Sequence, residues 1–141
     1  MKQRLNLITL GVDDMNASTA FFEGLGWTRS SASMDELSLF HLGGIVLALH
    51  PRKALAEDAK LSPDSSGFSG ITLAYNTESE KEVDEVLNAA AQLGATIIKP
   101  AEKAHWGGYS GYFRDLNGHV FEVAYNPFWP LDENQIIQLP E

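Results

Sequence analysis

The chain has 141 residues, 44% of them hydrophobic, and this size and composition predict one folded domain rather than two domains or a disordered segment. Ten Lys and Arg residues against nineteen Asp and Glu residues give a net charge of −9, which opposes non-specific binding to nucleic acid or to an anionic membrane. The sequence has no cysteine, which excludes disulfides, thiolate zinc sites and a cysteine nucleophile. No apolar stretch approaches the roughly 20 residues that span a bilayer, and the N-terminal residues do not resemble a signal peptide, so we expect a soluble, cytoplasmic protein.

The first half of the chain predicts a β-α-β-β-β module. In chain order, the expected elements are a strand at 5–12, a helix from Asn16 or Ser18 to Leu25, and strands at 27–31, 36–42 and 45–50. Gly26 fits the C-terminal cap of the helix, and Gly43-Gly44 fits a hairpin turn. Residues 51–61 predict a short helix, and the turn-forming residues 62–67 predict a linker.

The second half repeats this pattern. Its expected elements are a strand at 70–76, a helix at 78–93, and strands at 95–99, 109–114 and 119–125. Three segments match in the same order: ITLGV with ITLAY, GLGW with QLGA, and GGIVLAL with NGHVFEV. We therefore predict a single domain made of module one (1–61), the linker (62–67), module two (68–126) and a C-terminal tail (127–141).

Two longer segments resemble a known superfamily. ITLGVDDMNASTAFFEGLGW (8–27) and GYFRDLNGHVFEVAYNP (111–127) resemble the opening strand and helix and the closing hairpin of the vicinal oxygen chelate superfamily, with Leu116 where a proline is usual. That superfamily includes glyoxalases, bleomycin-resistance proteins and extradiol dioxygenases. The resemblance implies an α+β fold in which two tandem β-α-β-β-β modules form a curved, mixed sheet that encloses a cleft, with the helices on the convex face.

The resemblance also implies four positions for metal ligands, one on the first strand and one on the last strand of each module. Aligning the two modules places these positions at Leu7, Ala48, Gly70 and Glu122. Only Glu122 has a side chain that can donate to a metal, and a selective metal site needs several donors. We therefore predict that the usual metal centre is absent and that no cofactor is bound. A divalent metal held by Glu122 together with His50 is the disfavoured alternative.

Strand alternation predicts which side chains line the cleft. The expected lining is Thr9, His50, Thr72, Asn76, Trp106, Tyr109, Tyr112 and Glu122. Phe40, Phe128 and Trp129 are further candidates for covering this face. Glu122 is the only ionisable side chain expected deep in the cleft, which makes it a candidate catalytic acid or base.

Three functions remain open from the sequence. The preferred one is a glyoxalase/bleomycin-resistance-like protein that binds a small molecule without a metal. The second is a lyase, isomerase or dioxygenase-type enzyme that uses Glu122 or an unconventional metal site. The third is a structural or interaction protein that fills its own cleft. Because relatives with this fold commonly form dimers, a homodimer is a further expectation, with module exchange as one route to it.

Overall fold

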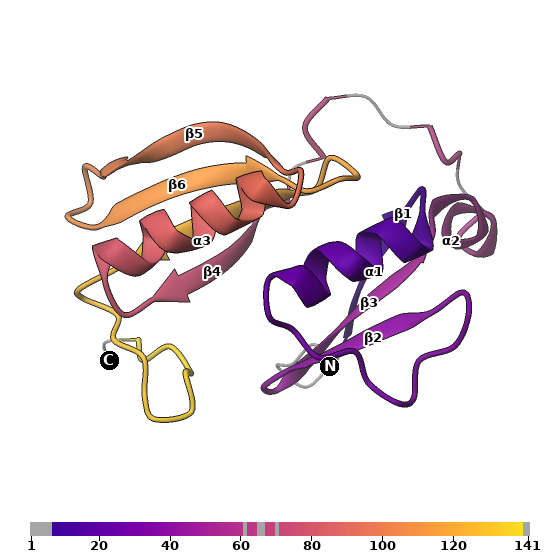
Figure 1. The fold of residues 1–141 in the computed structure, drawn as a ribbon, viewed down its shortest axis with the longest axis horizontal. Helices are drawn as coiled ribbons and strands as arrows, with labels where there is room; N and C mark the ends of the chain where they lie inside the picture. Colours follow the sequence, from indigo (N-terminus) through magenta and orange to yellow (C-terminus); the bar gives the residue numbers. More distant parts are fainter. Residues whose placement is uncertain (1–6, 61, 65–66, 70, 140–141) are drawn as a thin grey trace. The chain divides into compact units, whose positions relative to one another are not determined.

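The computed structural model describes residues 7–60, 62–64, 67–69 and 71–139. The chain divides into two compact units, Met1–Ser69 and Gly70–Glu141; the first has a sheet and two helices, and the second has a sheet and one helix (Figure 1). The predicted α+β class is confirmed, and the strands form two mixed sheets of three and four strands. Within the described residues, no helix is both long and apolar enough to cross a membrane.

The first unit contains a three-stranded sheet in the order β1-β3-β2. Its elements are β1 (Leu7–Val12), α1 (Met15–Gly24), β2 (Ser38–Leu42), β3 (Ile45–Pro51) and α2 (Arg52–Asp58). β1 pairs in parallel with β3, while β2 and β3 form the antiparallel hairpin predicted at Gly43-Gly44. Helix α1 lies across one face of this sheet (Figure 1).

Helix α1 begins earlier in the sequence than predicted. Asp14 is the N-cap, and its carboxylate accepts a hydrogen bond of 2.9 Å from the backbone N–H of Ala17. The predicted caps, Asn16 and Ser18, lie inside the helix, and Ser18 is buried. All three residue types cap helices well, so their order along the chain does not decide which one does so. The predicted stop is confirmed, because Gly26 follows the helix with a φ of +98°.

An aromatic cluster fills the space between α1 and the first sheet. Phe22 is 1% exposed, and its ring centroid lies 5.1 Å from that of Trp27 and 5.9 Å from that of Phe40. Phe40 therefore packs under α1, which corrects the expectation that it covers the opposite face. The strand predicted at 27–31 is also wrong. Only Arg29 pairs with Phe40 through an isolated bridge, since this segment packs Trp27 into the core instead of extending the sheet.

The second unit contains a four-stranded sheet in the order β4-β7-β6-β5. Its elements are β4 (Leu73–Thr77), α3 (Glu80–Gln92), β5 (Thr96–Lys103), β6 (Tyr109–Arg114) and β7 (Val120–Tyr125). β4 is parallel to β7, and the other neighbours are antiparallel. β5 extends to Lys103, beyond the predicted strand end at residue 99, and shifts its register twice along β6.

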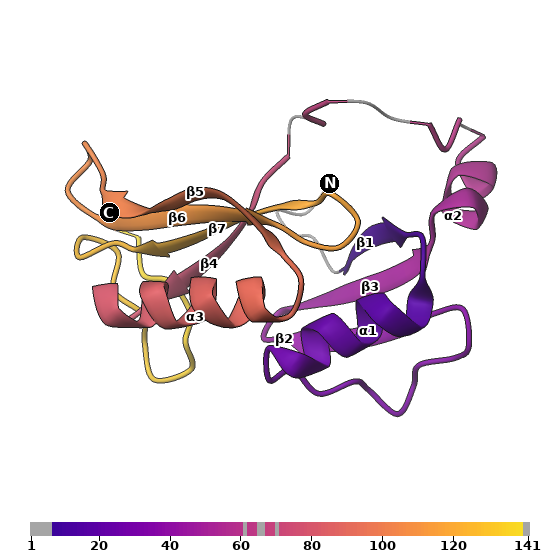
Figure 2. The same cartoon turned by 45° about the horizontal axis from the view of Figure 1, so that its top comes forward.

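Helix α3 covers one face of this sheet, as both views show (Figures 1 and 2). Val83, Leu87 and Ala90 recur at helical spacing and are buried. The rings of Phe113 and Phe121 stack with centroids 5.0 Å apart and belong to the same core. These contacts identify the face of the sheet that α3 covers. The candidate site lies on the opposite face.

The C-terminal segment folds locally around one aspartate. Asp132 Oδ1 accepts the backbone N–H groups of Asn134 and Ile136 at 2.8 and 2.9 Å. The Gln135 side chain donates to Glu78 at 3.1 Å, which ties this segment to the start of α3. The tail therefore packs on the second unit.

Candidate functional site

The register of the second sheet places Glu122 opposite Tyr112. These two residues are direct partners on β7 and β6, and their row continues to Ala74 on β4 and to Lys99 on β5. Directly opposed residues point to the same side of a sheet, and their neighbours along each strand point to the other side. Because Phe113 and Val123 alternate with this row and are buried with the α3 core, the row lies on the face that α3 does not cover.

We call this surface the Glu122 face. Its residues on the three paired strands β4, β7 and β6 are Ala74, Asn76, Ser110, Tyr112, Arg114, Val120, Glu122 and Ala124. It combines small side chains with hydroxyl, amide and carboxylate groups. Tyr112, Glu122 and Asn76 are partly exposed, so they are accessible to a ligand.

A hydrogen bond joins the two central side chains of this face. The Tyr112 hydroxyl donates to Glu122 Oε2. This bond raises the pKa of Tyr112 to about 12, with smaller contributions from burial and from the negative charge of Glu122. Tyr112 is therefore protonated at neutral pH and acts as a donor, while Glu122 is its acceptor.

The first sheet also has a face that α1 does not cover. Thr9 is the direct partner of Ala48, and His50 is the direct partner of Gly11, so these residues share that face. His41, whose register the sequence leaves undetermined, pairs with Val46 and lies there too.

Tyr109 is not on the Glu122 face, which corrects the prediction. Its hydroxyl donates to Asp84 on α3 at 2.8 Å, and this hydrogen bond raises the pKa of Tyr109. The reason is alternation, because Tyr109 is an odd number of residues from Tyr112 along β6 and so points to the other side. Lys103 lies 5.9 Å from the centre of the Tyr109 ring.

Two further predicted residues, Thr72 and Trp106, lie outside the strands that form the Glu122 face. Thr72 is exposed and precedes the first residue of β4. Trp106 lies in the loop between β5 and β6, and its ring packs on Gly108, where an added Cβ would be 1.8 Å from Trp106 Cζ3. Trp106 is 37% exposed.

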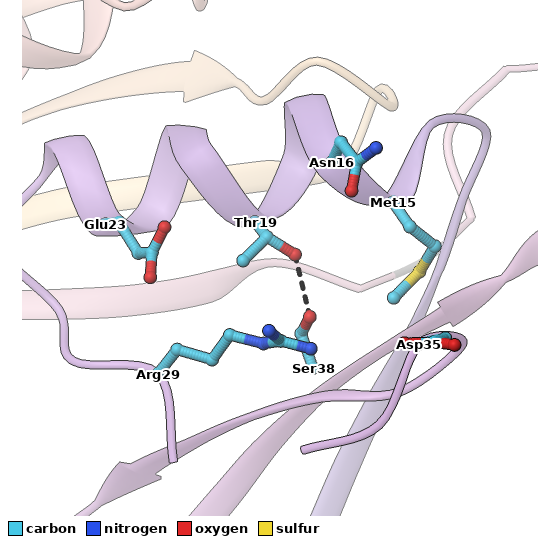
Figure 3. Close-up of a pocket in the computed structure, with 7 residues that line it drawn as sticks. All are labelled: Met15, Asn16, Thr19, Glu23, Arg29, Asp35 and Ser38. Atoms are coloured by element: carbon cyan, nitrogen blue, oxygen red, sulfur yellow. Dashed lines mark hydrogen bonds between the residues drawn. The ribbon is translucent and has the colours of Figure 1, made fainter. Parts of the chain in front are cut away.

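The structure also contains a cavity that the sequence reasoning missed. It has a volume of about 210 Å³ and lies between α1 and the residues that lead into β2 (Figure 3). Its lining residues are Met15, Asn16, Thr19, Glu23, Arg29, Asp35 and Ser38. The sequence signal for this cavity is a polar stripe on the helix that buries the phenylalanines. The stripe consists of Asn16, Thr19 and Glu23, which are spaced three and four residues apart.

Comparison with known proteins assigns the family. The model of the Glyoxalase/Bleomycin resistance protein/Dioxygenase superfamily matches residues 4–123. The chain belongs to this family. The resemblance to the vicinal oxygen chelate superfamily is thereby confirmed.

Relatives within the glyoxalase superfamily span nearly the whole chain. The metallothiol transferase FosB of Lysinibacillus sphaericus is 27% identical over 120 residues, covering 85% of this chain and 80% of that protein. A glyoxalase-related enzyme from Fulvimarina pelagi is 32% identical, with a TM-score of 0.90 and 99% of both chains covered. The fosfomycin resistance protein FosX from Listeria monocytogenes is 25% identical, with a TM-score of 0.70, covering 96% of this chain and all of that one.

The residues of this glyoxalase-superfamily member do not fit the metal centre that the resemblance implies. Leu7 on β1 and Ala48 on β3 have hydrocarbon side chains, and Ala48 is 1% exposed. Gly70 lies outside the described residues and has no side chain. Among the described residues, no group of three or more His, Cys, Asp or Glu side chains is placed to hold a metal ion. Glu122 is then one donor where divalent cations require several.

Proposed function

We propose that this chain is a metal-independent member of the glyoxalase superfamily that binds a small molecule on the Glu122 face. The observation that carries the proposal is the hydrogen bond from the Tyr112 hydroxyl to Glu122. A carboxylate that serves as a metal ligand points its oxygens at the cation together with other donors. Here the side chain opposite Glu122 supplies a proton donor, and the other superfamily positions supply no ligand atoms.

The chemistry of the face indicates the class of ligand. Tyr112 occupies one oxygen of Glu122, which leaves Oε1 as an acceptor for a ligand. A ligand group beside this oxygen has to donate a hydrogen bond or carry a positive charge, because an anion is repelled by the carboxylate. Asn76 adds a partly exposed amide group on the same face. We therefore infer a ligand that presents an N–H or O–H donor to Glu122.

Metal titration tests the first half of the proposal. Protein treated with a chelator is mixed separately with Mn²⁺, Fe²⁺, Co²⁺, Ni²⁺ and Zn²⁺, and metal content and thermal stability are measured. We expect no stoichiometric uptake and no rise in Tm, both for the wild type and for Glu122→Gln. One metal ion per chain that is lost in Glu122→Gln would contradict the proposal.

A ligand screen tests the second half. Thermal shift and calorimetry compare small amines, amides and alcohols with carboxylates and phosphonates. Fosfomycin is included because the FosX relative is a fosfomycin resistance protein. We expect binders among the donor compounds, and an affinity about tenfold lower in Glu122→Gln. Tyr109→Phe is the matched control, because it removes a hydroxyl from the opposite face of the same strand. Equal affinity in Glu122→Gln and wild type would argue against this site.

The same pair of residues supports an enzyme as a second candidate. Tyr112 stays protonated far above neutral pH, and Glu122 Oε1 is positioned to take a proton from a bound molecule. This arrangement suits a lyase or isomerase reaction that moves a proton without a metal. If the chain turns over a compound found in the screen, Glu122→Gln should abolish turnover and preserve the fold. Unchanged turnover in that variant would exclude Glu122 as the base.

A further inference from the structure

The cavity beneath α1 has walls of mixed charge. Two carboxylates, Glu23 and Asp35, and one guanidinium, Arg29, line it. In Figure 3, the Arg29 side chain extends along the cavity towards Ser38, with Glu23 at one end and Asp35 at the other. The ion pairs of the described residues include none of these three side chains. Opposite charges thus surround one space without pairing across it.

A pair of hydroxyls forms the polar floor of this cavity. The oxygens of Thr19 and Ser38 lie 2.7 Å apart, and Ser38 is 1% exposed. Two hydroxyls have two protons, and the bond between them uses one. The second O–H can be donated to a ligand in the cavity.

Arg29 supplies further N–H donors at this cavity. One of its terminal nitrogens donates to the backbone oxygen of Met34 at 2.9 Å, which holds the side chain along the cavity. A guanidinium has five N–H donors in a fixed fork, which suits a carboxylate best. The hydroxyl pair and Arg29 together therefore offer several donors to one anionic group.

We propose that this cavity binds a small zwitterion of amino-acid size, with a carboxylate at Arg29 and the Thr19–Ser38 hydroxyls and an ammonium at Glu23 or Asp35. The volume of about 210 Å³ equals roughly seven water molecules, which is enough for a ligand of amino-acid size. Met15 supplies an apolar wall for the remainder of the ligand. All lining residues of this site belong to the first unit, and none of them is a residue of the Glu122 face.

NMR titration of the full-length protein tests the proposal. Glycine and L-serine are the zwitterionic probes, acetate lacks the ammonium, and ethylamine lacks the carboxylate. We expect saturable amide shifts at residues 15–38 with the zwitterions, at a Kd of about 1 mM or below. Acetate and ethylamine should each bind at least about tenfold more weakly. Glu122→Gln should bind serine as the wild type does, which separates this result from the fate of the function proposed above.

Variants localise the binding. Arg29→Gln and Glu23→Gln should each weaken serine binding at least about tenfold, while the spectrum shows that the fold is intact. Lys53→Gln is the matched control, because Lys53 is an exposed cation of the same unit outside the cavity. The proposal is overturned if neither zwitterion gives saturable shifts, if acetate and ethylamine bind as tightly as serine, or if both cavity variants bind serine like the wild type.

Discussion

The hydrogen bond between Tyr112 and Glu122 predicts an unusual titration. The pKa of Tyr112 is raised from 10.0 to about 12. A shift of this size corresponds to about 2.7 kcal/mol of preference for the neutral phenol, and the partial exposure of both side chains reduces its contribution to stability to about 1 kcal/mol. The folded state holds the proton more tightly than the unfolded state. The contribution is therefore complete below pH 10 and is lost as the pH rises to about 12.

Replacing Glu122 with glutamine should remove most of this shift, because the variant has no negative charge to favour the neutral phenol. Tyrosine labelled with ¹³C at Cζ reports each phenol by NMR, and Tyr112→Phe assigns the resonance. We expect the pKa of Tyr112 to fall towards 10 in Glu122→Gln. Asp84→Asn is the control, since it should lower the pKa of Tyr109 only. A Tyr112 that still titrates near pH 12 in Glu122→Gln would refute the reasoning.

Three substitutions test the fold that positions the site, each by chemical denaturation. Asp14→Ala should lower the free energy of unfolding by about 1 kcal/mol through loss of the helix cap, and no change would show that the cap is not used. Phe22→Ala should cost about 3–5 kcal/mol because its ring is fully buried, and a cost below 1 kcal/mol would contradict the cluster. Gly111→Ala should cost about 1–3 kcal/mol, since the new Cβ would be 2.6 Å from Leu87 Cδ1, whereas Gly44→Ala meets open space and should cost less.

Much of the fold follows from local sequence patterns. The second unit matches the predicted order closely, because its helix has a clear apolar stripe and the turn at 115–118 joins two alternating strands. The strand predicted at 27–31 fails for a tertiary reason. The ring of Trp27 stacks on that of Phe22, which lies 5 residues earlier in the sequence. This contact competes with sheet pairing, and residue propensities do not encode it.

The candidate site, like the fold, is predictable from local sequence patterns only in part. Alternation alone places Asn76, Tyr112 and Glu122 on one face of the second sheet. The same rule assigns Tyr109 to the other face, so the sequence contained the signal for that correction. The polar stripe on α1 indicates one wall of the cavity, but the cavity itself forms only where the helix meets residues 29–38. Long-range packing, and not composition, brings Arg29 beside the Thr19–Ser38 hydroxyls.

On the proposed metal-independent function, the lack of donor side chains at the other superfamily positions changes what Glu122 recognises. A carboxylate that binds a metal cation neutralises part of the cation's charge. The positive charge that remains on the metal can still attract an anionic ligand. Without other donors, its negative charge acts directly on the ligand, so the same residue disfavours anions and selects hydrogen-bond donors. Tyr112 reinforces this selection, because it holds Oε2 and leaves Oε1 for the ligand. On the proposed function, the lack of donor side chains at Leu7, Ala48 and Gly70 affects the choice of ligand as well as metal binding.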